Sequence, residues 1–289
     1  MQRKRLRQYI MNSPAKINLY LHIVGHRDDH YHLLESIFVF TQWGDDIAIM
    51  PRKTITLSIT GPSALPLKYF PLEQNLCYRA AILLQKKFNI AEGAHIILQK
   101  NIPVSAGLGG GSSNAATVLK LLNQQWKLNL SQDILCELGA TIGADVPACI
   151  HATSAFVSGV GEKIQPITLS FAGYPVLLVN PNQPLSTQKV FQQFHHDAQA
   201  FTPSQSYQNT LEWISKQRND LEKPAMQLQP AIRAILEKLE QQPSCKLARM
   251  SGSGPTCFGI FETVIAAENA KLQLQKQFPL YWMKATVLC

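Results

Sequence analysis

Apolar and polar residues alternate without a break from residue 15 to residue 23. The positions of the apolar face include Ile17, Leu19, Leu21 and Ile23, and those of the polar face are Lys16, Asn18, Tyr20 and His22. Successive side chains of a strand point to opposite faces, so this pattern predicts a strand with one buried and one polar face. Apolar runs predict further strands at residues 36–40, 46–50, 54–60 and 94–99.

Helical patterns appear at three places in the first half of the chain. They cover residues 75–88, the segment that follows residue 111, and residues 131–143, where Ser131 is a suitable N-cap. In the middle segment Leu119, Leu122 and Trp126 recur at steps of three and four residues. Strands come first and helices later, which predicts an α+β fold for this half.

The second half has a different order of elements. Strands are predicted at residues 175–179, 246–250, 257–261 and 281–288, and helices at 186–195, 206–217, 228–241 and 264–278. This order resembles a split βαβ sandwich with extra helices in its first connection. A boundary between two domains, residues 1–165 and 166–289, is predicted between Glu162 and Gly173, where Pro166 and Gly173 flank a loose stretch.

The segment with the clearest chemistry is residues 103–114, with the sequence PVSAGLGGGSSN. Its four glycines allow a backbone to approach a ligand closely and to adopt positive φ. The helix that follows points its unpaired N–H groups and its positive dipole end back into this loop. The sequence therefore predicts an anion site, with a nucleotide phosphate as the expected anion.

Other interpretations of this loop fit the sequence less well. A flexible Gly-Ser linker does not usually follow an apolar strand and open directly into an amphipathic helix. The Walker A motif requires a Gly-Lys-Ser/Thr end, which this loop lacks. A dinucleotide fingerprint requires an acidic residue at the end of a second strand ~20 residues later, whereas Asp133 falls inside a helical pattern.

Composition and charge limit the classes of binding partner that we expect. Apolar residues make up 46% of the 289 residues, charged residues only 16%, and the formal net charge is +8. A basic surplus suits small anions or nucleic acid, but no basic stripe is interleaved with aromatic residues, so no nucleic-acid partner is expected. The chain has no apolar run long enough for a signal peptide or a membrane span, so we expect a cytoplasmic protein without a membrane partner. The sequence gives no expectation for the oligomeric state.

The pattern of cysteines agrees with the expected cytoplasmic location. None of the six belongs to a Cys-x-x-Cys pair, and most have apolar neighbours. We expect free thiols in a reducing environment rather than disulfides or a zinc site.

Three further places carry candidate chemistry. Lys16 and Asn18 share the polar face of the first strand and could converge on one ligand, although a lysine there could also be a solvated edge charge. Asp145 is the only charged residue between Glu137 and His151, so it must be paired, capping a helix, or functional. Residues 251–256 form a second glycine-rich turn, either a tight hairpin or a backbone nest for an oxyanion.

Together, residues 14–19, 103–116 and 251–258 resemble the three motifs of the GHMP kinase superfamily, in their usual order. Further details fit the resemblance: Asn114, the segments 143–147 and 159–162, the pair Tyr31–His32, and the pair Asn219–Asp220. The resemblance covers roughly residues 13 to 262. It implies a two-domain fold, with an ATP-binding N-terminal domain like a ribosomal-protein domain and a ferredoxin-like C-terminal substrate domain.

The resemblance also implies roles for single residues. Asp145 would accept or orient the proton of the substrate hydroxyl, and Lys16 would stabilise the transferring phosphoryl group. The implied ATP-binding residues are Pro103, Val104, Ser105, Ala106, Gly107, Leu108, Gly109, Gly110, Gly111, Ser112, Ser113, Lys100, Asn75 and Leu76. The implied substrate-binding residues are Asn18, Tyr31, His32, Thr187, Phe191, Gly252 and Ser253. Tyr31 and Phe191 would sandwich a cytosine ring, and His32 would bind its polar edge.

The implied reaction is γ-phosphoryl transfer from ATP with Mg²⁺ to the tertiary 2-hydroxyl of a cytidine-diphosphate-linked methylerythritol, in non-mevalonate isoprenoid precursor biosynthesis. No protein ligand for Mg²⁺ is assigned, although Ser113 is one option. Three alternatives remain open: a kinase of another small alcohol (homoserine, mevalonate or a sugar), a sensor that binds nucleotide without turnover, and a nucleic-acid-binding module.

Overall fold

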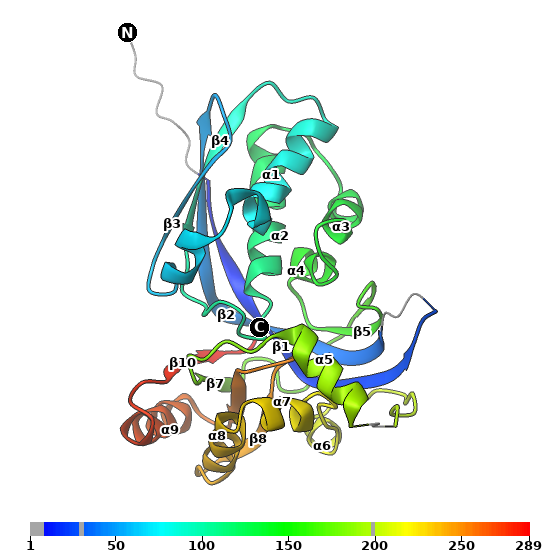
Figure 1. Cartoon of the computed structure of the whole chain (residues 1–289), viewed down its shortest axis with the longest axis vertical. Helices are drawn as coiled ribbons and strands as arrows, with labels where there is room; N and C mark the ends of the chain where they lie inside the picture. The colour runs from blue at the N-terminus through cyan, green and yellow to red at the C-terminus, as the bar shows by residue number, and fades with distance from the viewer. Residues whose placement is uncertain (1–8, 29–31, 198–199) are drawn as a thin grey trace. The chain divides into compact units, whose positions relative to one another are not determined.

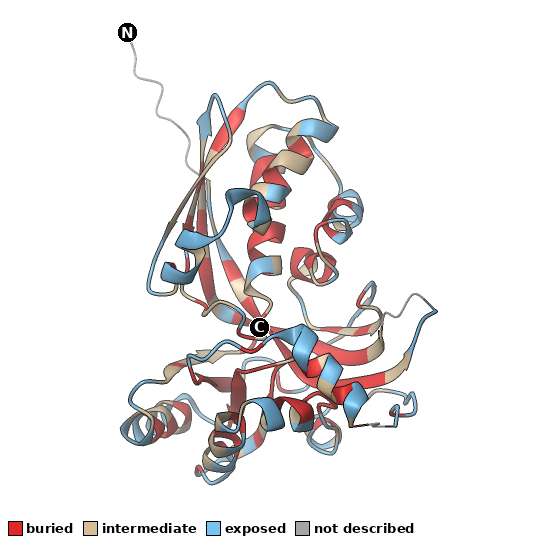
Figure 2. Ribbon diagram, viewed as in Figure 1, coloured by how far each residue is buried: buried red, intermediate tan, exposed pale blue. Residues whose placement is uncertain are grey.

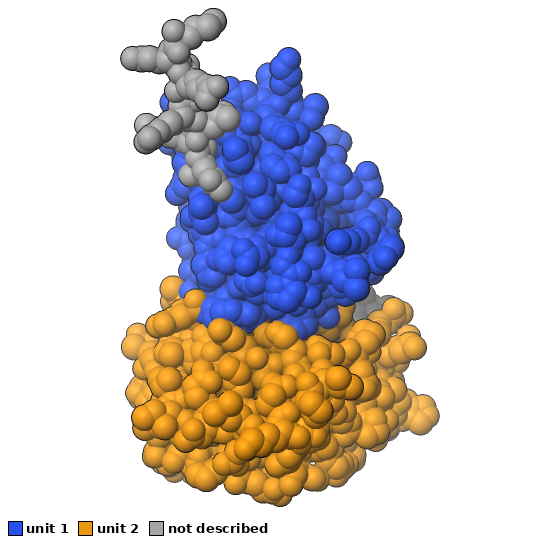
Figure 3. Space-filling view, turned by 90° about the vertical axis from the view of Figure 1, so that its left-hand side faces the viewer, with its two compact units in different colours: residues 1–15, 43–104, 109–152 blue, residues 16–42, 105–108, 153–289 orange. Residues whose placement is uncertain are grey.

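The computed structural model describes residues 9–28, 32–197 and 200–289, with the elements drawn in Figure 1. The chain forms two compact units, which Figure 3 colours separately. The first unit contains the described residues up to 15 together with 43–104 and 109–152, and the second contains 16–42, 105–108 and 153–289. Each unit combines separated stretches of sequence, and a division of the family domains between residues 165 and 166 stays a prediction.

The sheet of the first unit is completed by the strand that leads into the glycine loop. β4 (Gly93–Gln99) lies between β2 (His32–Arg52), to which it is antiparallel, and β3 (Thr56–Thr60), to which it is parallel. β1 (Tyr9–His26) also pairs with β2. The predicted strands at 36–40 and 46–50 are therefore parts of one long strand.

The helices of the first unit form a layer on this sheet. They are η1 (Leu65–Tyr69), η2 (Leu72–Gln74), α1 (Leu76–Lys87), α2 (Gly110–Gln125), α3 (Gln132–Ala140) and α4 (Val146–His151). α1 contacts β3 and β4, and α2 packs against α1, α3 and α4. α2 is central because Val118, Leu119 and Leu122 are all fully buried (Figure 2). Ser131 caps α3 as predicted, since its side chain accepts a hydrogen bond from the N–H of Ile134.

The second unit contains a four-stranded antiparallel sheet in the order β10-β7-β9-β8. The strands are β7 (Pro175–Asn180), β8 (Cys245–Met250), β9 (Cys257–Phe261) and β10 (Trp282–Val287). α8 (Ala231–Glu240) and α9 (Val264–Gln277) pack on this sheet. The order confirms the predicted split βαβ sandwich, and with it the α+β, two-domain fold class.

The other elements of the second unit lie outside this sheet. They are β5 (Ala155–Gly159), β6 (Lys163–Pro166), α5 (Thr187–His196), α6 (Leu211–Ser215) and α7 (Glu222–Leu228). β5 pairs with both β2 and β6. The stretch predicted to be loose, between Pro166 and Gly173, contains no helix or strand, and β6 ends where it begins. The helix predicted at 206–217 is wrong except for α6. Sequence analysis missed α7 because Pro224 interrupts its pattern, although a proline in the first turn of a helix loses no hydrogen bond.

None of the helices in the described ranges is both long and apolar enough to span a bilayer.

Candidate functional site

The glycine loop ends in a helix start that is open to a ligand. Gly109 is the N-cap of α2 and has a φ of 62°, and Gly107 has a φ of 74°. No side chain of the described residues caps α2 at this end. Its first N–H groups therefore point into the loop without a capping acceptor, which is the arrangement that binds phosphate at helix N-termini.

In the second unit, backbone hydrogen bonds hold the middle of this loop. The carbonyl of Leu108 accepts a hydrogen bond from the N–H of Lys16 at 2.9 Å, and the carbonyl of Gly107 accepts one from Ser251 Oγ at 2.9 Å. The N–H of Thr256 donates to the carbonyl of Ala106 at 3.2 Å. The structure thus brings together the three segments that the sequence identified: the first strand, the glycine loop and the 251–256 turn.

Contact between the loop and the turn is close enough to require glycine. A Cβ atom on Gly107 would lie 2.4 Å from the carbonyl oxygen of Ser251 and 2.8 Å from that of Gly254. Any side chain at position 107 would therefore force the two backbones apart.

Lys16 and Asn18 lie together beneath this loop, as the alternation predicted. Lys16 Nζ donates to Asn18 Oδ1 at 2.8 Å and lies 4.2 Å from the centre of the Phe38 ring. The Asn18 side chain donates in turn to Ser36 Oγ at 2.9 Å, and its backbone N–H donates to Ser251 Oγ at 3.1 Å. Both side chains are buried, at 4% and 2% exposed. Lys16 is therefore a positioned charge and not a solvated edge lysine.

In the first unit, a buried carboxylate anchors the first turn of α2. Asp45 is fully buried and accepts hydrogen bonds from Lys100 Nζ, from the N–H groups of Asn101 and Ile102, and from Asn114 Nδ2. Asn114 also donates to Ser13 Oγ, which donates to Ser113 Oγ. Lys100 Nζ, predicted to contact ATP, is thus paired with Asp45 beside Gly110.

Sequence analysis missed Asp45 because its partners lie more than 50 positions away along the chain. Its only local signal was an acidic residue between two apolar runs, which looks like an ordinary turn between strands.

Asp145 stands directly before α4, at its N-cap position, but its side chain makes no capping bond. Capping, the plain alternative for this residue, therefore does not explain its position. Asp145 belongs to the first unit and Lys16 to the second, and a meeting of the two beside a triphosphate stays a prediction.

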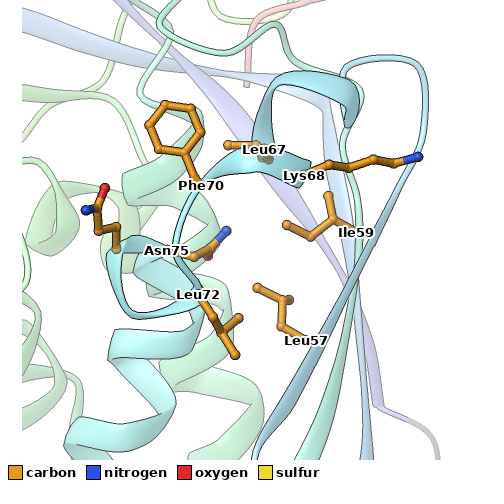
Figure 4. A pocket seen from close by; sticks show the side chains of 8 residues that line it. Leu57, Ile59, Leu67, Lys68, Phe70, Leu72 and Asn75 are labelled. Carbon is orange, nitrogen blue, oxygen red and sulfur yellow. The ribbon is translucent and has the colours of Figure 1, made fainter.

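A cavity of about 280 Å³ opens beside the start of α1 (Figure 4). Its lining is mainly apolar and comes from β3, η1 and η2, with Asn75 and Lys68 among the polar groups; the apolar side chains are those of Leu57, Ile59, Leu67, Phe70 and Leu72. Asn75 caps α1 by accepting from the N–H of Cys77. Leu76 follows, and a Cβ on Gly111 would lie 3.4 Å from its side chain. The predicted contacts Asn75 and Leu76 therefore connect an apolar cavity with the first turn of α2.

The predicted cytidine-side residues gather in the second unit, apart from Tyr31, which lies outside the described residues. The ring centroids of His32 and Phe191 are 4.5 Å apart, and the planes of the two rings are inclined by 30°. Thr187 Oγ1 and Ser253 Oγ are 2.7 Å apart and share a hydrogen bond. Gly252 has a φ of 57°, and its carbonyl accepts a hydrogen bond from Asn219 Nδ2.

His195 was missed by the sequence analysis. Its Nε2 atom lies 2.7 Å from Nε2 of His32, so one ring donates to the other. Burial lowers the pKa of His32, and His195 and His26 lower it further. The two histidines are 163 residues apart, and no local pattern connects them.

The described residues contain no cluster of three or more His, Cys, Asp or Glu side chains that could hold a metal ion. Ser113 Oγ, the predicted option for Mg²⁺, accepts a hydrogen bond from Ser13 at 3.0 Å and keeps a lone pair for a further partner.

Comparison with known proteins agrees with this arrangement. Residues 75–153 match the N-terminal domain of the GHMP kinases, and residues 201–280 match their C-terminal domain. The chain is 39% identical to the 4-diphosphocytidyl-2-C-methyl-D-erythritol kinase of Chelativorans sp., over 95% of this chain and 94% of that protein. It is 40% identical to the same kinase of Dinoroseobacter shibae, over 96% of this chain and 93% of that protein.

Solved structures give the same result. A crystal structure of 4-(cytidine 5'-diphospho)-2C-methyl-D-erythritol kinase matches with a TM-score of 0.80 and 31% identity, over 97% of this chain and 99% of that one. The homoserine kinase of Cytophaga hutchinsonii shares the fold, with a TM-score of 0.67 at 15% identity, over 96% of each chain. The chain therefore belongs to the GHMP kinase family, in the group of the 4-diphosphocytidyl-2-C-methyl-D-erythritol kinases.

Proposed function

We propose that this protein transfers the γ-phosphoryl group of ATP to the 2-hydroxyl of 4-diphosphocytidyl-2-C-methyl-D-erythritol, giving the 2-phosphate and ADP. The observation that carries the proposal is the convergence of three segments in the second unit. Lys16 and Asn18 lie against the glycine loop, and Ser251 hydrogen-bonds to both the loop and Asn18. Phosphoryl transfer depends mainly on such positioning and on charge neutralisation.

The proposed binding of ATP rests on the glycine loop, the start of α2 and the cavity beside α1. The N–H groups at the start of α2 bind the phosphates of ATP, and the mainly apolar cavity beside Asn75 receives its adenine ring. Because Lys16 is buried and its ammonium group is held by Asn18, its charge is fixed in position. A fixed charge of this kind stabilises developing negative charge without reorganisation during the reaction.

The proton of the acceptor hydroxyl goes to Asp145 or is oriented by it. A positioned carboxylate commonly contributes about 10²- to 10⁴-fold to the rate as a base. Mg²⁺, when bound, neutralises charge on the phosphates. It usually takes most of its ligands from phosphate and water, so a single protein donor, for which Ser113 Oγ is the option, would be sufficient.

The proposed recognition of the acceptor substrate rests on the aromatic pair His32 and Phe191. Phe191 stacks on the cytosine ring and His32 binds its polar edge, so the base is recognised by groups remote from the reacting hydroxyl. Thr187 and Ser253 lie together at the start of α5 and complete this side. The compartment we propose is the cytoplasm, which agrees with the six cysteines being free thiols.

An assay of ADP release with three acceptors tests the proposal. We expect turnover with 4-diphosphocytidyl-2-C-methyl-D-erythritol and only background with mevalonate or homoserine. Lys16→Ala and Asp145→Asn should each lose most of kcat while melting as cooperatively as the wild type. Turnover with mevalonate or homoserine as fast as with the cytidine-linked acceptor would refute the proposal, and near-normal kcat in both variants would refute the assigned roles.

A further inference from the structure

A second, larger cavity lies on the first unit, and none of its lining residues has been assigned a role so far. Its volume is about 570 Å³, and one wall is the outer face of α1 while the other is the turn after α3, at Thr141 and Ile142. None of its lining residues belongs to the cavity of Figure 4. We call it the α1 groove. Its size falls within the range of small-molecule sites.

The floor of the α1 groove is apolar. Ile82 and Leu83 are half-buried side chains of α1, Tyr78 lies one turn before them, and Ile142 faces them with only 8% of its surface exposed. A ligand that covers this floor would remove apolar surface from water, which favours binding.

Three cations line the same groove. Arg79, Lys86 and Lys87 are exposed, and within the described part of the chain none of them makes an ion pair. Glu73 is the only acidic side chain of the lining. The groove therefore presents an excess of positive charge beside an apolar surface, which complements an anion with an apolar body.

Helix electrostatics accounts for two of these cations but not for the third. Lys86 and Lys87 stand in the last turn of α1, where the helix dipole favours positive charge. Arg79 stands near the N-terminal end, where the dipole disfavours it, and the first turn contains no acidic residue to offset it. Arg79, Leu83 and Lys86 follow the i, i+4, i+7 spacing and so form one row along the groove.

We propose that the α1 groove is an effector site for a small anionic amphiphile. Its phosphate or carboxylate group would lie along the row of Arg79 and Lys86, and its apolar chain over Ile82 and Ile142. The walls connect this site with the reaction: α1 begins beside Asn75, and the turn at 141–142 leads to Asp145. A ligand that bridges the walls would therefore change the kinetic constants for ATP.

Three probes separate the contributions of charge and chain. Octyl phosphate carries both, octyl glucoside carries the chain alone, and inorganic phosphate carries the charge alone. By isothermal titration calorimetry below the micellar concentration, octyl phosphate should bind at least ~10-fold more tightly than either control, at a stoichiometry of one. Equal affinity for octyl phosphate and octyl glucoside, or no binding of octyl phosphate, would overturn the proposal.

Matched variants locate the binding. Arg79→Gln and the double variant Lys86→Gln/Lys87→Gln should each weaken octyl phosphate binding at least ~5-fold. Lys276→Gln, which removes a last-turn lysine of α9, should leave the affinity unchanged. All three are substitutions of exposed side chains, and thermal melting verifies their folding. Unchanged affinity in the groove variants would overturn the proposal.

Two further readouts exclude other occupants. Saturating ATP should change the affinity for octyl phosphate only by a limited factor, because two coupled sites affect each other reciprocally. Complete, competitive displacement would assign the binding to the nucleotide site and overturn the proposal. Sedimentation should show a molecular mass that does not depend on protein concentration or on the groove variants. A dimer that these variants dissociate would make the groove a contact between two copies and overturn the proposal. These binding measurements do not depend on the proposed reaction. A failure of octyl phosphate to bind is therefore distinguishable from a failure of the proposed kinase activity.

Discussion

Gly107 is a position where a single methyl group should reduce both stability and activity. In Gly107→Ala the new Cβ would lie 2.4 Å from the carbonyl oxygen of Ser251, where ordinary contact begins at 3.4 Å. The glycine loop and the 251–256 turn must therefore separate by about 1 Å, and a misplacement of that size can reduce the rate about 10²-fold. The positive φ adds a strain of about 1–2 kcal/mol for any residue with a Cβ.

Gly173→Ala is the matched control for this substitution. Gly173 has a φ of 84°, and a Cβ on it would have no atom within 4 Å among the described residues. Gly173→Ala should therefore show the backbone strain alone: the free energy of unfolding should fall by about 1–2 kcal/mol, and the activity should stay normal. In a chain of this size each kcal/mol lowers Tm by about 2–4 °C.

The assay combines thermal melting with kcat/KM for ATP, measured well below both melting temperatures. We expect Gly107→Ala to lose about 10²-fold in kcat/KM and to melt lower than Gly173→Ala. If the two variants have equal Tm and equal activity, the close approach of loop and turn plays no part in positioning ATP, and the reasoning fails.

Three other predictions concern single contacts. Asp45→Asn should destabilise the protein by about 3–5 kcal/mol in urea unfolding, because it leaves Lys100 buried without its anion, while Asp46→Asn should change stability little. Ser251→Ala should cost about 1–3 kcal/mol in the same assay, because it removes the partner of the buried Asn18 N–H and of the half-buried Gly107 carbonyl. Burial, and then His195, lower the pKa of His32, so KM for the cytidine-linked acceptor should rise on acidification with a midpoint below that of an ordinary histidine. His195→Ala should move that midpoint to higher pH. An unchanged midpoint in His195→Ala would contradict this assignment.

Sequence periodicity predicted the elements whose pattern is local. Alternation from residue 15 to 23 identified β1, although pairing with β2 extends the strand to Tyr9–His26. The glycine loop was correctly followed by a helix, which begins at Gly110. The strand predicted at 257–261 agrees with β9 in both bounds. In each case a few neighbouring residues determine the local structure.

Features that depend on distant partners were not predictable in this way. β5 and β6 are short, and pairing defines them: β5 pairs with β2, and β6 pairs with β5. The role of Asp45 depends on Lys100 and Asn114, which reach it only after the strands and α2 have packed. Local sequence therefore indicated which motifs bind, whereas tertiary packing determines how they are held.

The position of the transferred phosphate tests the central claim most directly. The 2-hydroxyl of the proposed acceptor is on a tertiary carbon, so its phosphate ester has no proton on the attached carbon. After one turnover with ATP, ³¹P NMR of the product should show a new monoester signal without three-bond coupling to a carbinol proton. A product signal split by such a proton, or no new monoester at all, would contradict the account.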